Sequence, residues 1–205
     1  MRRKTTIIIV VIIALALVSV IVFEAYNAGA IPGTVANSPS PQGNNSPTPI
    51  EDGTVLGINP TSLQLTSSQI GETIQLDINI TNVKDLWAWD LKDLSFNPKV
   101  LNLTQVTEGP FLAKGGQTLF IWTSTATMAL AKGDIPEIST LLLLSKEGVS
   151  GSGKLATLSF NVIAPGTSQI TFNQTTLLNP TEIQTGVHGI INVASTINGL
   201  VTVYP

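Results

Sequence analysis

The stretch Ile74-Gln75-Leu76-Asp77-Ile78-Asn79-Ile80-Thr81 decides the fold class of this chain, because every second residue is apolar and its neighbour is polar. A period of two is typical of a β-strand with one buried face. Shorter runs with the same period follow at residues 157–162, 170–173 and 201–203, and turns rich in Gly, Pro and Asn separate them. The pattern predicts about eight to ten strands, packed as an antiparallel β-sandwich over residues 54–205.

Two segments depart from simple alternation. Residues 140–145 are apolar on both phases, which indicates a central strand, and residues 126–132 could form a short helix. Around Lys92-Asp93 the apolar phase slips by one residue, because Trp89 and Leu91 are followed by Leu94. We therefore predict a β-bulge at this point.

Composition excludes several classes of function. The chain has 205 residues, no cysteine and a single histidine, so disulfides, thiol nucleophiles and cysteine or multi-histidine metal sites are impossible. Acidic residues outnumber basic ones, 13 to 10, and no stripe of Lys and Arg is present to bind nucleic acid. No catalytic residue, cofactor site or metal site is predicted.

The N-terminal region predicts export and a tether. Residues 1–4 form a basic tip, and residues 5–26 begin with an uncharged run of 19 residues, Thr5 to Phe23, which spans roughly 28 Å as a helix. The positive-inside rule places the tip in the cytoplasm and the domain outside the cell. A cleaved signal peptide ending near residue 30 and a pilin-like helix remain alternatives. Residues 27–53 are rich in Pro, Ser and Asn and predict a disordered linker.

Two stretches resemble the cohesin family. The segment from Trp89-Asp90-Leu91 through Leu94-Ser95-Phe96-Asn97-Pro98-Lys99-Val100-Leu101 to Val106-Thr107-Glu108-Gly109 is similar to a cohesin strand and its aromatic-Asn-Pro-x-Val-Leu turn. The segment Gly151 to Val162 is similar to the family's later Gly-x-Leu-Ala strand. The resemblance implies a jelly-roll-like sandwich that binds dockerin-type partners, whose own calcium sites would supply the metal.

The resemblance also implies a binding face. In cohesins the outward positions of the strand that carries Trp89-Asp90-Leu91 lie on the face that docks the partner's helices, so Ala88, Asp90 and Lys92 are the candidates for partner contact. Asp90 matches an acidic position of that face, whereas Ala88 replaces a polar one. A carbohydrate-binding module, with Trp87, Trp89 and Trp122 as stacking residues, and a surface-layer or filament subunit with an open strand edge remain alternatives. Period two instead favours a core position for Trp87 and Trp89.

The other motifs are interpreted as ordinary structural features without a chemical role. Gly148 to Lys154 satisfies the spacing of a phosphate-binding loop, but Leu155 follows where Ser or Thr is needed, so a hairpin loop is favoured. The acidic pairs Asp90 with Asp93 and Asp134 with Glu137 are interpreted as solvated surface, and His188 as a loop residue. Sequons for N-glycosylation begin at Asn44, Asn79, Asn102 and Asn173.

Overall fold

The computed structural model describes residues 53–123, 127–180 and 189–205. The predicted anchor 5–26, nearly all of the linker, Asn44 and His188 lie outside these residues. None of the described helices has the length and apolar character needed to cross a bilayer. The described residues belong to a compact unit, Thr48–Pro205, with its own hydrophobic core, and a unit of this kind is expected to fold by itself.

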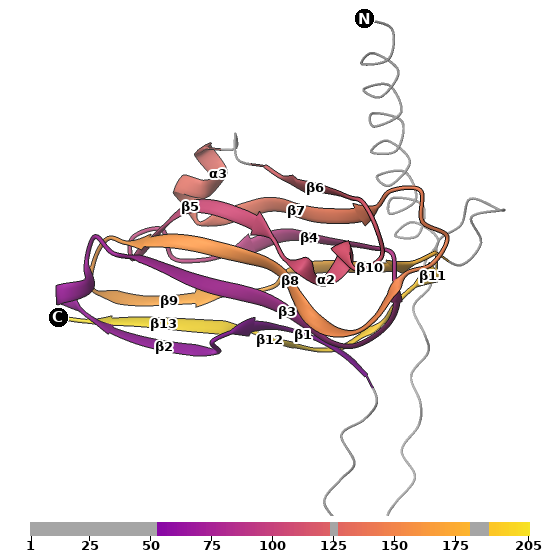
Figure 1. Ribbon diagram of the computed structural model, residues 1–205. Coiled ribbons are helices and arrows are strands. Elements are labelled where there is room, and N and C mark those ends of the chain that lie inside the picture. Colours follow the sequence, from indigo (N-terminus) through magenta and orange to yellow (C-terminus); the bar gives the residue numbers. More distant parts are fainter. Residues whose placement is uncertain (1–52, 124–126, 181–188) are drawn as a thin grey trace, which may run out of the picture. The chain divides into compact units, whose positions relative to one another are not determined.

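The architecture is a sandwich of two five-stranded sheets with a smaller third sheet (Figure 1). The first sheet has the order β12-β1-β3-β8-β5, with bounds Val193–Ile197, Thr54–Asn59, Thr73–Leu86, Val149–Val162 and Leu101–Glu108. The second has the order β11-β10-β4-β7-β6, with bounds Gly189–Ile190, Gln174–Asn179, Ala88–Ser95, Asp134–Leu142 and Thr118–Trp122. The third has the order β2-β13-β9, with bounds Ser62–Thr66, Gly199–Tyr204 and Gly166–Ile170.

The predicted sandwich is confirmed, and its strands are more numerous than expected. Thirteen strands form within the described part of the chain. Most pairs are antiparallel, but β1 pairs with β12 in parallel and β13 pairs with β2 in parallel. Three helical turns complete this part of the chain: η1 (Ser67–Gln69), α2 (Pro110–Ala113) and α3 (Thr127–Lys132). α3 occupies the region where the sequence allowed a short helix.

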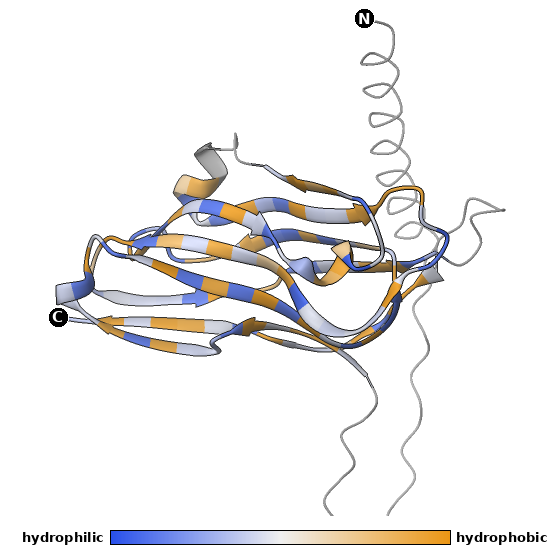
Figure 2. Cartoon of the chain, viewed as in Figure 1, coloured by the Kyte–Doolittle hydropathy of each residue, from blue (hydrophilic) through white to orange (hydrophobic). Residues whose placement is uncertain are grey.

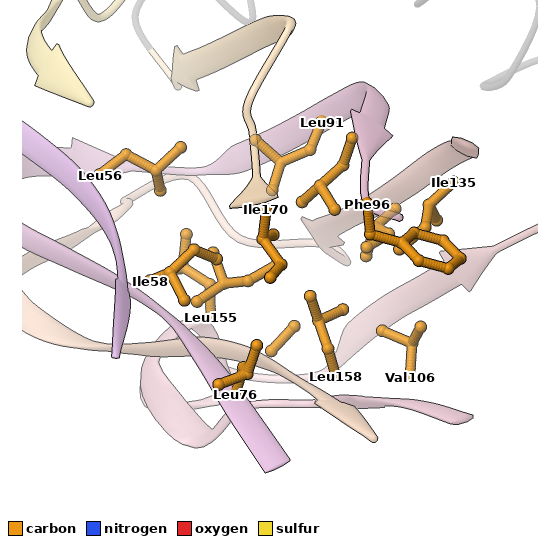
Figure 3. Packing of buried hydrophobic residues seen from close by; sticks show 14 of the residues in the cluster. Leu56, Ile58, Leu76, Leu91, Phe96, Val106, Ile135, Leu155, Leu158 and Ile170 are labelled. Atoms are coloured by element: carbon orange, nitrogen blue, oxygen red, sulfur yellow. The ribbon is translucent and has the colours of Figure 1, made fainter. Parts of the chain in front are cut away.

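The core lies between the sheets because each strand turns its apolar phase inward. On β3, Ile74, Leu76, Ile78 and Ile80 are buried and their neighbours face outward, and Figure 2 shows the same alternation of hydrophobic and hydrophilic residues along other strands. Strand β8 lies between β3 and the edge strand β5, and its residues 155–160 are buried on both faces. Figure 3 shows side chains from many strands meeting in this core, listed here in part: Leu56, Leu76, Leu91, Phe96, Leu158 and Ile170.

The two cohesin-like stretches meet inside this core. The Phe96 ring packs edge-on against the Phe160 ring, with ring centroids 5.2 Å apart. Asn97 then closes the turn: its backbone oxygen accepts from the N–H groups of Val100 and Leu101, and its side-chain amide donates to a carbonyl of β9. Val100 and Leu101 are buried immediately after this turn. The turn motif therefore encodes a packed corner of the sandwich.

The predicted phase slip on β4 is present, but it is not a one-residue bulge. Lys92 pairs with Glu137 and Leu94 pairs with Ile135, so the register against β7 does not shift. Asp93 instead adopts a left-handed conformation with φ of 53°. The partner strand slips as well, since both Ile135 and Ile138 are buried. Both strands change phase together, which is why the pairing stays in register.

The expectation of a hairpin loop at Gly148–Lys154 is wrong, because Val149–Lys154 form the first half of β8. Opposite them, β3 bulges twice: Ile80, Val83 and Leu86 pair with every second residue of β8. Asn82 and Asp85 take the left-handed conformation at these bulges, and Ser152 and Ser150 accept hydrogen bonds from their N–H groups. The Ser and Gly residues that resembled a phosphate loop therefore pair with the bulged part of β3.

The prediction of a central strand at residues 140–145 is half right. β7 does lie between β4 and β6, but it ends at Leu142. Leu143 is 38% exposed and Leu144 is 100% exposed, with φ of 59°. These two apolar residues belong to the turn into β8 and do not contribute to the core.

Candidate partner-binding face

The three residues proposed for partner contact share one side of β4. Trp89 and Leu91 point into the core, so the alternate residues Ala88, Asp90 and Lys92 face away from it. They lie near the middle of a sheet because β4 is flanked by β10 and β7. The three side chains therefore face outward, as the alternation along this strand predicted.

Cross-strand pairing identifies their neighbours, because residues opposite one another in an antiparallel pair share a face. We define the β4 face as the outward side of β10, β4, β7 and β6. Its apolar row contains Leu178, Ala88, Leu141 and Leu119. Its middle row contains Thr176, Asp90, Ser139 and Ile121, and its charged row contains Gln174, Lys92 and Glu137. Sequence reasoning missed all the residues contributed by β10, β7 and β6, since register between distant strands leaves no local signal.

The interpretation of Asp90 as solvated surface is wrong, because its side chain is buried on this face. It is only 8% exposed, and Lys92 Nζ lies 3.4 Å from its Oδ2. Its other oxygen, Oδ1, is buried and accepts no hydrogen bond from the described residues. Burial raises the pKa of Asp90 above its ordinary value, Lys92 opposes that rise and Glu137 adds to it. A buried carboxylate oxygen without a donor is costly in a free protein, so the position is suited to a donor brought by a partner.

The outward side of the other large sheet offers a contrast. Asp77 on β3 also pairs with a lysine, since Lys154 Nζ lies 3.3 Å from its Oδ2. Its Oδ1, however, accepts a hydrogen bond of 2.6 Å from the Thr157 hydroxyl. Both oxygens of Asp77 are therefore partnered within the domain. Of these two acid–lysine pairs, only the one on the β4 face leaves a carboxylate oxygen without a donor among the described residues.

The tryptophans do not form a stacking platform. Trp89 is 1% exposed and belongs to the core, as its phase predicted. Trp87 and Trp122 are half-buried and pack against that core, and the Trp87 indole N–H donates to the backbone oxygen of Ser145 at 3.2 Å. Coplanar exposed rings, which a carbohydrate-binding module of this kind would need, are not formed by these three residues.

The described sequons occupy different settings. Asn102 is exposed on β5, and Asn79 is half-buried on β3. Asn173 is exposed, but its side-chain amide donates to the backbone oxygen of Asp93. The acidic residues do not gather either: within residues 53–123, 127–180 and 189–205, no group of three or more His, Cys, Asp or Glu side chains could hold a metal ion.

Comparison with known proteins agrees with this geometry. The cohesin domain model matches residues 61–203, which is most of the chain. The chain belongs to the cohesin family. Comparison with curated protein sequences finds none that matches significantly.

Solved cohesins share the fold at low sequence identity. A non-cellulosomal cohesin from the hyperthermophilic archaeon Archaeoglobus fulgidus is 18% identical, with a TM-score of 0.55 over 75% of this chain and 92% of that one. The third cohesin of ScaC from Acetivibrio cellulolyticus, in complex with the ScaB dockerin, is 14% identical, with a TM-score of 0.55 over 74% and 99%. The cohesin of a type I cohesin–dockerin complex from Clostridium thermocellum is 14% identical, with a TM-score of 0.53 over 74% of this chain and 99% of that one.

Proposed function

We propose that this cohesin is a non-catalytic attachment module that binds a dockerin-type protein through its β4 face. Two of the similar structures are cohesins in complex with dockerins, which supports this class of partner. The observation that carries the proposal is the buried Asp90 Oδ1, which has no hydrogen-bond donor among the described residues and lies on the face that the cohesin resemblance implies. A partner hydroxyl or ammonium group would bond to it once the Asp90 side chain turns outward.

The other residues of the β4 face would make two kinds of contact with a partner, apolar and charged. In the apolar row, Leu178 and Ala88 are already buried, whereas the half-buried Leu141 and Leu119 would gain further burial against a partner's apolar side chains. Lys92 and Glu137 would select the partner's charges in the adjacent row. With Ala at position 88, the contact beside Asp90 relies on packing, so the partner should differ from those of cohesins with a polar residue there.

We also propose that the domain works outside the cytoplasm on a membrane tether. The uncharged run from Thr5 to Phe23 behind Arg2, Arg3 and Lys4 supports an anchor with its N-terminus in the cytoplasm. The Pro- and Ser-rich residues 27–53 would hold the β4 face away from the bilayer. Cleavage near residue 30 would instead release the same module.

A pull-down tests the partner class. Residues 48–205 serve as bait for the host's secreted and surface proteins, once with calcium and once with a chelator, and Asp90→Ala bait serves as the matched control. The proposal expects wild-type bait to retain a dockerin-bearing protein only with calcium, and the variant to retain much less of it. Folded bait that captures no such protein, or equal capture by both baits, contradicts it.

A further inference from the structure

The edge strand β6 differs from the other outer strands of the two large sheets. It closes one side of its sheet, and no described strand pairs with its far edge (Figure 1). Its residues Thr118-Leu119-Phe120-Ile121-Trp122 contain neither proline nor charge, and residues 115–131 around it contain no charged residue. Its pairing with β7 is regular. Apolar, unbroken edges of this kind are templates for adding another strand.

The other edges carry features that hinder pairing. On β5, the edge strand of the opposite sheet, the register shifts between Leu103 and Gln105, so a bulge interrupts the edge. β12 is a parallel edge strand whose register against β1 shifts at Thr54/Val55. β11 has only two residues. β6 alone of these four combines length, regular pairing and an apolar sequence.

The backbone of β6 has donors and acceptors on its open side. The N–H of Thr123 bonds to the oxygen of Glu137, and the oxygen of Gln117 accepts from Leu143. Because bonded pairs alternate in an antiparallel ladder, residues 119 and 121 also bond to β7. The N–H and C=O groups of Thr118, Phe120 and Trp122 therefore point away from the sheet.

We propose that β6 pairs with β6 of a second copy, antiparallel about a two-fold axis at Phe120. This register sets Phe120 opposite its own copy and Thr118 opposite Trp122, so all the outward groups meet in about six backbone hydrogen bonds. Leu119 then lies opposite Ile121 on the β4 face. A two-fold contact requires a surface that complements itself, and an uncharged strand brings no like charges together.

The lack of charge on β6 favours a second copy of the chain as the strand that pairs with it. β6 has no group that would select a foreign strand, whereas its apolar residues, all half-buried, gain further burial against the same residues of the copy. The resulting ten-stranded sheet would place two β4 faces side by side. A dimer of this form would bind two partners at once, and it closes on itself without building a filament.

Sedimentation of residues 48–205 over a range of concentrations tests the proposal. Thr118→Pro removes one outward N–H per copy and no bond to β7, so it should weaken dimerisation about 25-fold, because two hydrogen bonds are lost and each contributes roughly five-fold. Thr118→Val keeps the N–H and should dimerise as the wild type does. A wild type that stays monomeric at about 1 mM overturns the proposal. So does a Thr118→Pro variant that dimerises normally.

Amide hydrogen exchange on the wild type gives a second test that needs no folded variant. The amides of Phe120 and Trp122 should become protected as concentration rises, whereas that of Leu119, bonded to β7, should be protected throughout. If the amide exchange rates of Phe120 and Trp122 do not depend on protein concentration, pairing at this edge is refuted. Neither experiment depends on dockerin binding.

Discussion

Replacing Asp90 by alanine should stabilise the free domain while weakening its binding to a partner. The carboxylate is buried with one oxygen lacking a donor among the described residues. Such a group lowers stability in the free protein and becomes useful only when a partner supplies the missing hydrogen bond. Opposite changes in stability and affinity would distinguish a binding residue from a structural one.

The size of the stability change follows from two opposing contributions. A buried polar group without a hydrogen bond costs about 1–3 kcal/mol. The ion pair with Lys92, whose side chain is 35% exposed, offsets about 0–1 kcal/mol of this cost. Asp90→Ala should therefore raise the free energy of unfolding by about 1 kcal/mol near neutral pH, which corresponds to about 2–4 °C in Tm for a domain of this size.

The gain should also depend on pH. Because burial raises the folded-state pKa of Asp90, the folded protein keeps this proton at pH values where the unfolded chain has released it. The unfolded state then binds fewer protons, so wild-type stability falls as pH rises from the ordinary value of 3.8 through the raised pKa. The advantage of Asp90→Ala is thus largest above that window and shrinks as the pH falls towards 3.8.

Urea unfolding of residues 48–205 at several pH values measures both effects. Glu72→Ala is the control, since Glu72 is an exposed acid away from the β4 face, and it should change stability by no more than about 0.5 kcal/mol. A loss of stability of more than about 1 kcal/mol in Asp90→Ala at neutral pH would mean that Asp90 is satisfied within the free domain, and would refute this reasoning.

Three further predictions concern the scaffold. A double-mutant cycle of Phe96→Leu and Phe160→Leu should give a coupling energy of about 1 kcal/mol in chemical unfolding, because the rings pack edge to face; additive effects would contradict this contact. Gly109→Ala should cost about 3 kcal/mol in Tm-derived stability, since its Cβ would overlap the Lys154 backbone; a neutral change would refute that packing. Asp85→Ala should cost about 2 kcal/mol, because Asp85 is left-handed and its carboxylate accepts a hydrogen bond from the backbone N–H of Gly148, and Asp85→Asn should cost much less in the same assay.

The sequence predicts the strands well wherever one face is buried and the other is solvated. From Ile74 to Ile80, buried residues alternate with outward ones as the sequence pattern predicts. The Phe96-Asn97-Pro98 turn packs as the cohesin resemblance implies. Prediction from the sequence fails where pairing with a second strand changes the alternation of buried and outward residues. The phase slip at Asp93 was visible, but its mechanism required knowing that β7 slips too.

The candidate site was predicted only in part for the same reason. Alternation along β4 places Asp90 and Lys92 on one face, because that is a local property of a strand. Their neighbours Glu137, Ser139 and Thr176 come from β7 and β10, and the register that brings them there is set by tertiary packing. The open oxygen of Asp90 also depends on that packing, so no local pattern could indicate it.

Calorimetric titration of a purified dockerin-type partner into residues 48–205 tests the central claim most directly. Asp90→Ala is compared with Asp77→Ala, which removes the matching acid–lysine pair on the opposite sheet. The account predicts that Asp90→Ala weakens binding at least about ten-fold, because a charged hydrogen bond is lost at the interface, and that Asp77→Ala leaves Kd unchanged. Unchanged affinity in Asp90→Ala together with a loss in Asp77→Ala would place the partner on the other face and contradict it.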